Sequence, residues 1–288
     1  MSYDFTFNAS AIGVGGLLTD GEVTTAIPSL ASVALAPTGG EGFSEETNYN
    51  QYGVSFTKAE SRVVGQKIAP DTYATYVNVL ISNFAVRNRL KIGCMQASMT
   101  SIRNIKDDDS RFEFRAAYRG VSFDGNEIAP ELDLDLIGCS TYDEFRRHLG
   151  CSTKDFAQRF GYAGEPALVS ALTSPRQPAI CGTLVKPLDA QQALVNSEDS
   201  GIILTGHKIV VRDFGSVNLA EFLFKPGRRR VSLVRLDFDE RFVSTSPAPD
   251  ATPVARAFVL ADGGGNGGGG SLTGGSVEGN GSTIPPRI

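Results

Sequence analysis

The stretch VNLAEFLFKPGRRRVSLVRLDF, residues 217–238, indicates the fold class most directly. Two almost wholly apolar runs, 217–224 and 231–238, flank a short basic segment that contains Pro226 and Gly227. Proline presets the backbone φ of the second residue of a type II turn, and glycine accepts the positive φ that the third residue needs. The stretch therefore predicts a β-hairpin with Pro226 and Gly227 at its tip.

Four cations surround that predicted tip: Lys225, Arg228, Arg229 and Arg230. Successive strand residues point to opposite faces, so at most Arg228 and Arg230 share one face, and the patch is too short for a nucleic-acid interface. Arginine is enriched in protein interfaces. We therefore interpret the four cations as candidates for a contact between subunits and expect no nucleic-acid partner.

Sequence patterns typical of β-strands extend over most of the chain. Residues 3–11 alternate apolar with polar side chains, and residues 71–86 and 90–105 read as a long hairpin that turns at residues 87–89. Asp124-Gly125 is typical of a type I′ turn. Leu132, Leu134 and Leu136 alternate with acidic residues, which predicts one more strand.

A predicted helical segment interrupts these strand patterns near Thr141. Thr141 and Glu144 have the spacing of a capping box, in which each side chain bonds a backbone N–H at the start of a helix. Residues 152–161 repeat the pattern, and residues 165–172 and 189–195 are further candidate helices.

We therefore predict a mainly β protein, an antiparallel β-sandwich or two packed β modules with a small helical insert. The expected domains are an N-terminal β module (1–140), a helical or irregular insert (141–200), and C-terminal hairpins with a glycine-rich tail (201–288). The tail segment GGGNGGGGSLTGG (263–275) lacks the Lys of a phosphate loop, and a last short strand is expected after it.

Composition narrows the classes of function. The 288 residues carry 27 Lys and Arg against 32 Asp and Glu, a net charge of −5 that gives no global attraction for polyanions. No stretch approaches the roughly 18 apolar residues of a membrane span, and no signal peptide is recognised, so we expect a cytoplasmic start, with a surface location reached by another route left open.

Reactive side chains are sparse, and no catalytic constellation or cofactor site is predicted. A zinc site would need Cys139, His148, Cys151 and Cys181 to converge, although their irregular spacing favours ordinary thiols. A hydrolase would need a site around His207 or carboxylates such as Asp133. We predict that the protein is not an enzyme.

Tyrosines are the candidates for ligand binding, because their rings can stack on sugars and their hydroxyls can form hydrogen bonds. The candidates on predicted strands or turns are Tyr49, Tyr52, Tyr73, Tyr76 and Tyr118. Ordinary packing within a strand remains the alternative for each of them.

Three segments carry a resemblance to a known group: ASAIGVGGLLTDGEVTTAIPSLASVAL from residue 9, FEFRAAYRGVSFDGNEI from residue 112, and FGSVNLAEFLFKPGRRRVSLVRLDF from residue 214. They resemble β-rich bacterial proteins of the choice-of-anchor type. The resemblance implies β-rich modules found at cell surfaces or in assemblies, and it brings no catalytic motif.

The function that we predict from the sequence is structural: a self-associating subunit of a filament, shell or surface layer. The alternative is a binding module for a carbohydrate or another extended ligand, and a hydrolase is the third hypothesis.

Overall fold

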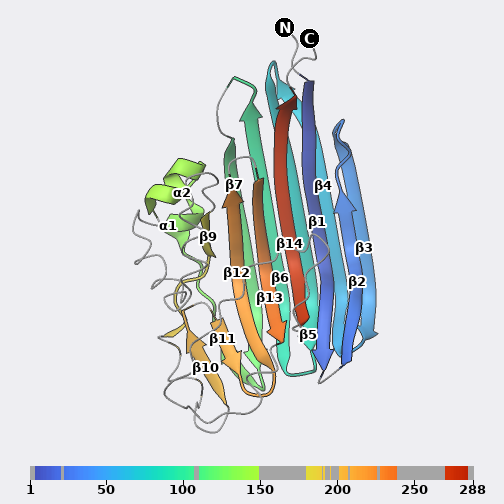
Figure 1. Ribbon diagram of the computed structural model, residues 1–288, viewed down its shortest axis with the longest axis vertical. Helices are drawn as coiled ribbons and strands as arrows, with labels where there is room; N and C mark the ends of the chain where they lie inside the picture. Colours follow the sequence, from blue (N-terminus) through green and yellow to red (C-terminus); the bar gives the residue numbers. More distant parts are fainter. Residues whose placement is uncertain are drawn as a thin grey trace.

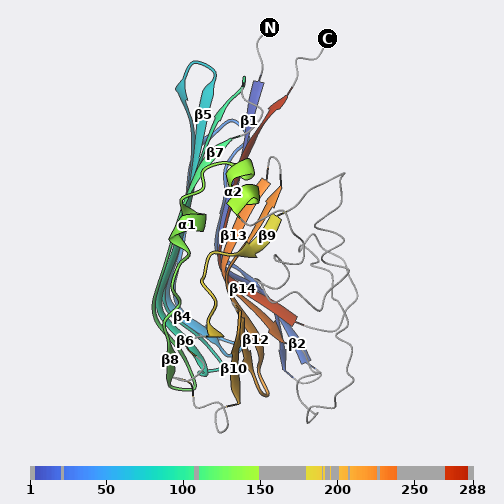
Figure 2. The same cartoon turned by 90° about the vertical axis from the view of Figure 1, so that its left-hand side faces the viewer.

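The computed structural model describes residues 4–20, 23–106, 110–148, 180–189, 191, 195, 201–206, 208–225, 228–238 and 270–284. These residues form two antiparallel β-sheets that lie face to face as a sandwich, with two short helices at one side (Figures 1 and 2). The fold is mainly β with a small helical insert, as the sequence predicts.

Sheet A has eight strands in the order β10, β11, β12, β13, β14, β1 and β2, with β9 pairing the other half of β12. The bounds are β1 Asp4–Asp20, β2 Val23–Ala34, β9 Ile180–Thr183, β10 Ile202–Thr205, β11 Lys208–Val211, β12 Gly215–Lys225, β13 Arg228–Phe238 and β14 Gly270–Ile284.

Sheet B has six strands in the order β3 to β8, each antiparallel to the next. Their bounds are β3 Gly40–Gln51, β4 Val54–Ala69, β5 Thr72–Val86, β6 Leu90–Asn104, β7 Arg111–Phe123 and β8 Asn126–Ile128. The predicted long hairpin is β5 and β6. Asp124 and Gly125 both have positive φ, +49° and +83°, as the predicted turn between β7 and β8 requires.

The first and last described strands lie side by side. β1 pairs β14 over nearly its whole length, from Asp4 opposite Ile284 to Gly16 opposite Leu272. β14 also pairs β13, so the N-terminal strands β1 and β2 belong to the same sheet as the C-terminal hairpin. The predicted division into modules 1–140 and 201–288 therefore does not match the sheets, because a pairing between the two ends of the chain crosses it.

The inner faces of the two sheets form one hydrophobic core. β1 and β14 lie over β4, β5 and β6, and both faces supply Val, Ile, Leu, Met and Phe side chains that are almost completely buried. Phe112, Phe114, Phe145, Phe222 and Phe224 pack ring against ring where β7, β12 and helix α2 meet. Helix α2, Tyr142–His148, thereby packs against one side of the sandwich.

The helical insert confirms one prediction and corrects another. Thr141 Oγ1 accepts the Glu144 N–H at 3.2 Å, and Glu144 Oε2 accepts the Thr141 N–H at 3.1 Å, which is the predicted capping box. Residues 134–137, predicted as a strand, form the short helix α1, Leu134–Ile137, because the Asp133 carboxylate accepts the Leu136 N–H at 3.1 Å and caps it.

In sheet A, the pairing of five adjacent strands is interrupted at one common level, a row that we call crease A. In the registers of the strand pairs, one residue on each of β12, β13, β14, β1 and β2 has no Cα partner. These residues are Ala220, Leu233, Gly275, Gly13 and Ala31. The register is the same before and after the row, because each strand skips one residue there. Ala220, Gly275 and Ala31 have positive φ.

Sheet B has the matching row, crease B. It consists of Asn48, Thr57, Asn83, Gly93 and Gly120 on β3 to β7, and positive φ again falls on alternate strands, at Asn48, Asn83 and Gly120. The inward-facing set changes parity across the crease, from Val77, Val79 and Ile81 to Phe84 and Val86 on β5. Both sheets bend along their strands in Figure 2.

A hydrogen bond joins the two creases across the core. The Tyr118 hydroxyl, two residues before Gly120, donates to the Leu233 carbonyl at 2.5 Å. Leu233 is skipped in the pairing of β13 with β12 and in its pairing with β14, so the Tyr118 hydroxyl supplies a donor for the Leu233 carbonyl. Burial raises the pKa of the Tyr118 hydroxyl far above its ordinary value, so it keeps its proton and remains a donor.

Replacing Tyr118 with Phe removes this donor and leaves the ring. We expect Tyr118→Phe to lower the free energy of unfolding by about 1 to 3 kcal/mol, because a buried carbonyl loses its partner. Urea unfolding followed by circular dichroism measures the change. Tyr76→Phe is the matched control, since Tyr76 lies on the outer face, and equal stability of the two variants would contradict the assignment.

Gly275 in crease A offers a second test. A Cβ there would lie 2.6 Å from Leu233 Cδ1, and its φ is +66°. Gly125 has a φ of +83° but nothing within 4 Å of a Cβ, so Gly125→Ala carries the backbone strain without the clash. We expect Gly275→Ala to lower the free energy of unfolding by about 1 to 3 kcal/mol more than Gly125→Ala does. Equal losses in a denaturant titration would show that the clash relaxes freely.

Candidate functional surfaces

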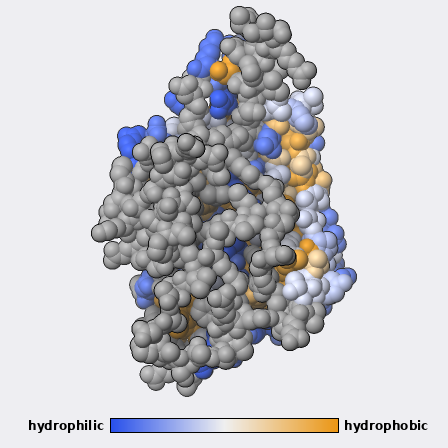
Figure 3. Space-filling model, in the orientation of Figure 1, coloured by the Kyte–Doolittle hydropathy of each residue, from blue (hydrophilic) through white to orange (hydrophobic). Residues whose placement is uncertain are grey.

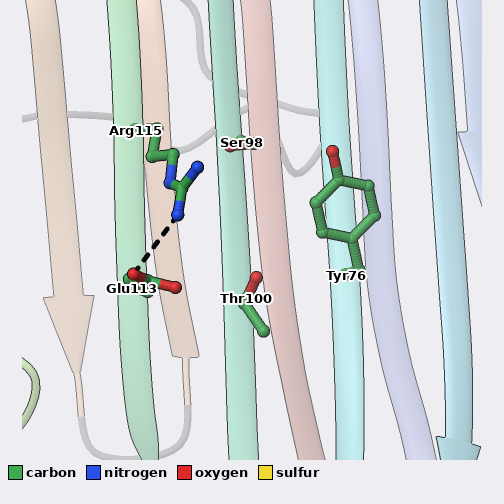
Figure 4. Close-up of a pocket in the computed structure, with 5 residues that line it drawn as sticks. All are labelled: Tyr76, Ser98, Thr100, Glu113 and Arg115. Atoms are coloured by element: carbon green, nitrogen blue, oxygen red, sulfur yellow. Dashed lines mark ion pairs between the residues drawn. The ribbon is translucent and has the colours of Figure 1, made fainter.

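The outer face of sheet B carries a hollow over strands β5, β6 and β7 (Figure 4). Alternation places the five lining side chains on this one face, and the register aligns Tyr76 with Thr100 and Glu113, and Ser98 with Arg115. The hollow has a volume of about 220 Å³. It is lined by Tyr76, Ser98, Thr100, Glu113 and Arg115.

Side-chain size makes this hollow. β6 contributes small side chains, Ser98 and Thr100, while the strands on either side contribute Tyr76 from β5 and Glu113 and Arg115 from β7. Since neighbouring strands lie about 4.8 Å apart, the two walls stand roughly 10 Å apart. The result is a groove along β6 with a hydroxyl-bearing floor.

A second hollow continues the groove along β6. It has a volume of about 290 Å³, shares Tyr76, Ser98 and Arg115 with the first, and adds Gln96, Ala116 and Ala117. The Gln96 side-chain amide donates to Asn78 Oδ1 at 3.1 Å, so further polar groups follow the floor. We call the two hollows together the β6 groove.

The charges of the β6 groove cancel. Glu113 and Arg115 form an ion pair, with Arg115 Nη2 3.6 Å from Glu113 Oε1 and the side chains 68% and 78% exposed. An ion pair as exposed as this contributes little to stability. Either side chain can therefore leave its partner and bind a ligand with little loss of free energy. The arrangement suits uncharged polar ligands.

Only one of the five candidate tyrosines lines this groove. Tyr76 does so, and Tyr52 is exposed at the turn between β3 and β4. Tyr49, Tyr73 and Tyr118 face inward, which corrects their assignment as platforms. Tyr49 stacks on Phe56, Tyr73 stacks on Phe5 with ring centroids 4.1 Å apart, and Tyr118 binds Leu233.

The predicted basic patch also changes. Arg229 is fully buried, stacks over the Phe112 ring and donates from Nη2 to the Ser110 carbonyl, because its position on β13 faces the core. It is therefore no interface candidate. Arg230 faces outward and donates to Ser276 Oγ at 3.2 Å. The side chains of Lys225 and Arg228 lie outside the described part of the chain.

A polar cluster lies on the outer face of sheet A. Arg235 donates to the Glu221 carboxylate from Nε and Nη2, and to Asp237 from Nη1, while Asn218 donates to Asp237 at 3.0 Å. Asn218 and Glu221 are the polar positions of the otherwise apolar run 217–224. The arginine bonds both carboxylates, and its contact with Glu221 links β13 to β12.

The described residues contain no group of three or more His, Cys, Asp or Glu side chains placed as metal ligands would be. Cys139 donates to the Asp135 carbonyl at 3.6 Å, and His148 is exposed at the end of α2. Asp133 caps α1. Cys151, His207 and the side chain of Cys181 lie outside the described residues, as do the predicted helices at 152–161 and 165–172 and residues 190 and 192–194 of that predicted at 189–195. Within the described part, no helix has the length and apolarity needed to cross a bilayer.

Strand β2 forms a long, uncharged edge of sheet A. Its sequence VTTAIPSLASVA contains no charged residue, and Figure 3 shows apolar surface on the flank where β1 and β2 lie in Figure 1. Leu35 donates its N–H to the Ala9 carbonyl at 2.8 Å. Bonded and non-bonded pairs alternate in an antiparallel ladder, so the N–H and C=O groups of Ala34 and Ser32 point away from β1.

The other sheet edges in the described residues are shorter or charged. β8 has three residues, and β9 and β10 have four each. β3 is long but carries Glu41 and Glu45, which pair with Arg62 and Lys58 on β4. Short and charged edges are features with which sheet proteins prevent edge-to-edge association. β2 has neither of them, and it carries Pro28 and a shift of register between Leu30 and Ile27.

Comparison with known proteins identifies a family. The model of a family described as a domain of unknown function (DUF8256) matches residues 5–225. No curated protein and no solved structure matches the chain. The matched region runs from β1 to the end of β12 and includes the whole of sheet B with its groove. The chain therefore belongs to the DUF8256 family.

Proposed function

We propose that the protein is a structural subunit that associates with copies of itself through the edge of strand β2. The observation that carries the proposal is a twelve-residue edge strand without a charged side chain, whereas the other edges in the described part of the chain are short or charged. Unpaired backbone groups on such an edge are a template for another strand.

Pairing of β2 with β2 of a second copy satisfies these groups. An antiparallel pair of identical strands has two-fold symmetry, so the eight-stranded sheets A of two copies would form one continuous sheet of sixteen strands. Ser32 and Ala34 supply the outward donors and acceptors, whereas Pro28 has no N–H and limits pairing at its own position. The segment after Pro28 is therefore the expected centre of the contact.

The neighbouring edge strand does not oppose this contact. β3 follows β2 in the chain, and its exposed Glu41 and Glu45 are each within 3.2 Å of a cation on β4. The approach of two β3 strands in the paired copies therefore brings together charge pairs and not bare carboxylates. A filament, shell or layer needs a further contact, because a two-fold pair is closed.

The resemblance to choice-of-anchor proteins supports the same direction, since it implies modules found at cell surfaces or in assemblies. The predicted absence of enzymatic activity is part of the proposal and stays a prediction.

Ser32→Pro tests the proposal directly. It removes one outward N–H from the β2 edge and no hydrogen bond of the ladder to β1, so we expect the variant to be monomeric. Sedimentation velocity over a range of protein concentrations measures the association, with the wild type expected to form dimers or larger species.

Ser32→Thr is the matched control, because it keeps the N–H at the same position and must associate as the wild type does. Thermal unfolding of both variants checks that the fold is retained. A wild type that sediments as a monomer at all concentrations would refute the function, and an associating Ser32→Pro protein would refute the role of β2.

A further inference from the structure

We propose that the β6 groove binds a neutral linear polysaccharide, with one sugar ring on Tyr76 and the chain running along β6. This site lies on sheet B and is separate from the β2 edge, so it does not depend on self-association. The proposal rests on the position of the Tyr76 ring, on the polar groups around it, on the charge of the lining and on the length of the groove.

The Tyr76 ring is placed as a stacking platform. Tyr76 is 37% exposed although it lies in the middle of a long strand. Figure 4 shows its ring nearly face-on over β5, so one face of the ring is open to solvent. Sugar rings have an apolar face of C–H groups that packs on an aromatic ring, while their hydroxyls remain at the rim.

The groups around Tyr76 match such a rim of hydroxyls. Ser98 and Thr100 on the floor can each donate and accept a hydrogen bond. Across the groove, the Glu113 carboxylate offers paired acceptors and the Arg115 guanidinium offers paired donors, and both are planar forks suited to two adjacent hydroxyls. In Figure 4 the Arg115 and Glu113 side chains point toward each other on the wall opposite Tyr76.

The charge of the lining argues for an uncharged ligand. Glu113 and Arg115 compensate each other, and Tyr76, Ser98, Thr100, Gln96 and Ala117 carry no charge. An acidic polymer would meet the Glu113 carboxylate inside the groove. A neutral chain meets only hydrogen-bonding groups.

The length of the groove argues for a polymer and not for a single sugar. The two hollows overlap at Tyr76, Ser98 and Arg115 and extend from Thr100 to Gln96 on β6. Alternate residues on a strand are about 7 Å apart, so this distance is roughly 14 Å. The groove is open at the sheet surface, as a site for the interior of a chain must be.

Affinity gel electrophoresis with soluble neutral polysaccharides tests the proposal. The wild-type protein is run through native gels that contain hydroxyethyl cellulose, xylan, galactomannan or glucomannan, and we expect at least one of them to retard it. Tyr76→Ala should weaken that binding about tenfold, which corresponds to the loss of one aromatic contact.

Two further variants make the result specific. Tyr52→Ala is the matched control, since Tyr52 is an exposed tyrosine away from the groove, and it should leave the retardation unchanged. Ser98→Tyr keeps Tyr76 but fills the floor of the groove, so it should abolish binding. Circular dichroism and sedimentation of each variant show that the fold and the association state are retained.

Several outcomes would overturn the assignment. Absence of retardation by all four neutral polysaccharides would do so, as would retardation that neither Tyr76→Ala nor Ser98→Tyr reduces. Gels with polygalacturonate or hyaluronate complete the test, because retardation by these acidic polymers alone would move the ligand to the exposed Arg111 and Arg119 of β7. None of these outcomes bears on the β2 edge, which is tested by sedimentation alone.

Discussion

The structure depends on the alignment of crease A with crease B, held by the hydrogen bond from Tyr118 to the Leu233 carbonyl. A single strand that inserted an extra residue would lose register with its neighbours and turn its following side chains to the wrong face. Here each central strand makes the insertion at the same level, so the register survives and the inward-facing set changes parity in all of them together. The core remains continuous because the parity of the inward-facing side chains changes at levels of the two sheets that face each other.

This alignment explains the unusual backbone at several residues. Ala31 and Ala220 have φ of +47° and +45°, a conformation that costs an alanine about 1 to 2 kcal/mol. Neighbouring interactions hold Ala220 there. The Ala220 carbonyl accepts the Leu184 N–H at 3.0 Å, and the adjacent Leu219 carbonyl accepts from Thr183 Oγ1 at 2.7 Å. In crease B, Thr57 Oγ1 donates to the Ser82 carbonyl and accepts a hydrogen bond from the Asn83 side-chain amide. Side-chain hydrogen bonds there take the place of strand-to-strand backbone bonds.

Local patterns predicted the local structure, and contacts between distant segments decided the rest. The hairpin of β5 and β6, the Asp124-Gly125 turn and the capping box at Thr141 could be identified because a few neighbouring residues determine each. Alternation failed at residues 132–136, where the Asp133 cap starts a helix that a period of two does not reveal. The pairing of β1 with β14 and the burial of Arg229 depend on segments far apart in sequence. Tyr76 was named with four other tyrosines, and only the register with Ser98, Thr100 and Glu113 distinguishes it from them.

The two proposed surfaces are compatible because they lie on different parts of the sandwich. β2 ends sheet A, whereas the β6 groove lies on the outer face of sheet B, over its central strands. Edge pairing through β2 therefore adds a copy beside the molecule and covers neither groove. Two grooves in one rigid pair could engage one polysaccharide chain, which presents the same repeating unit many times. A second contact of this kind becomes intramolecular after the first, so even weak single-site binding gives firm attachment of the pair. Self-association and glycan binding would then act together, since assembly multiplies the number of sites without altering any of them.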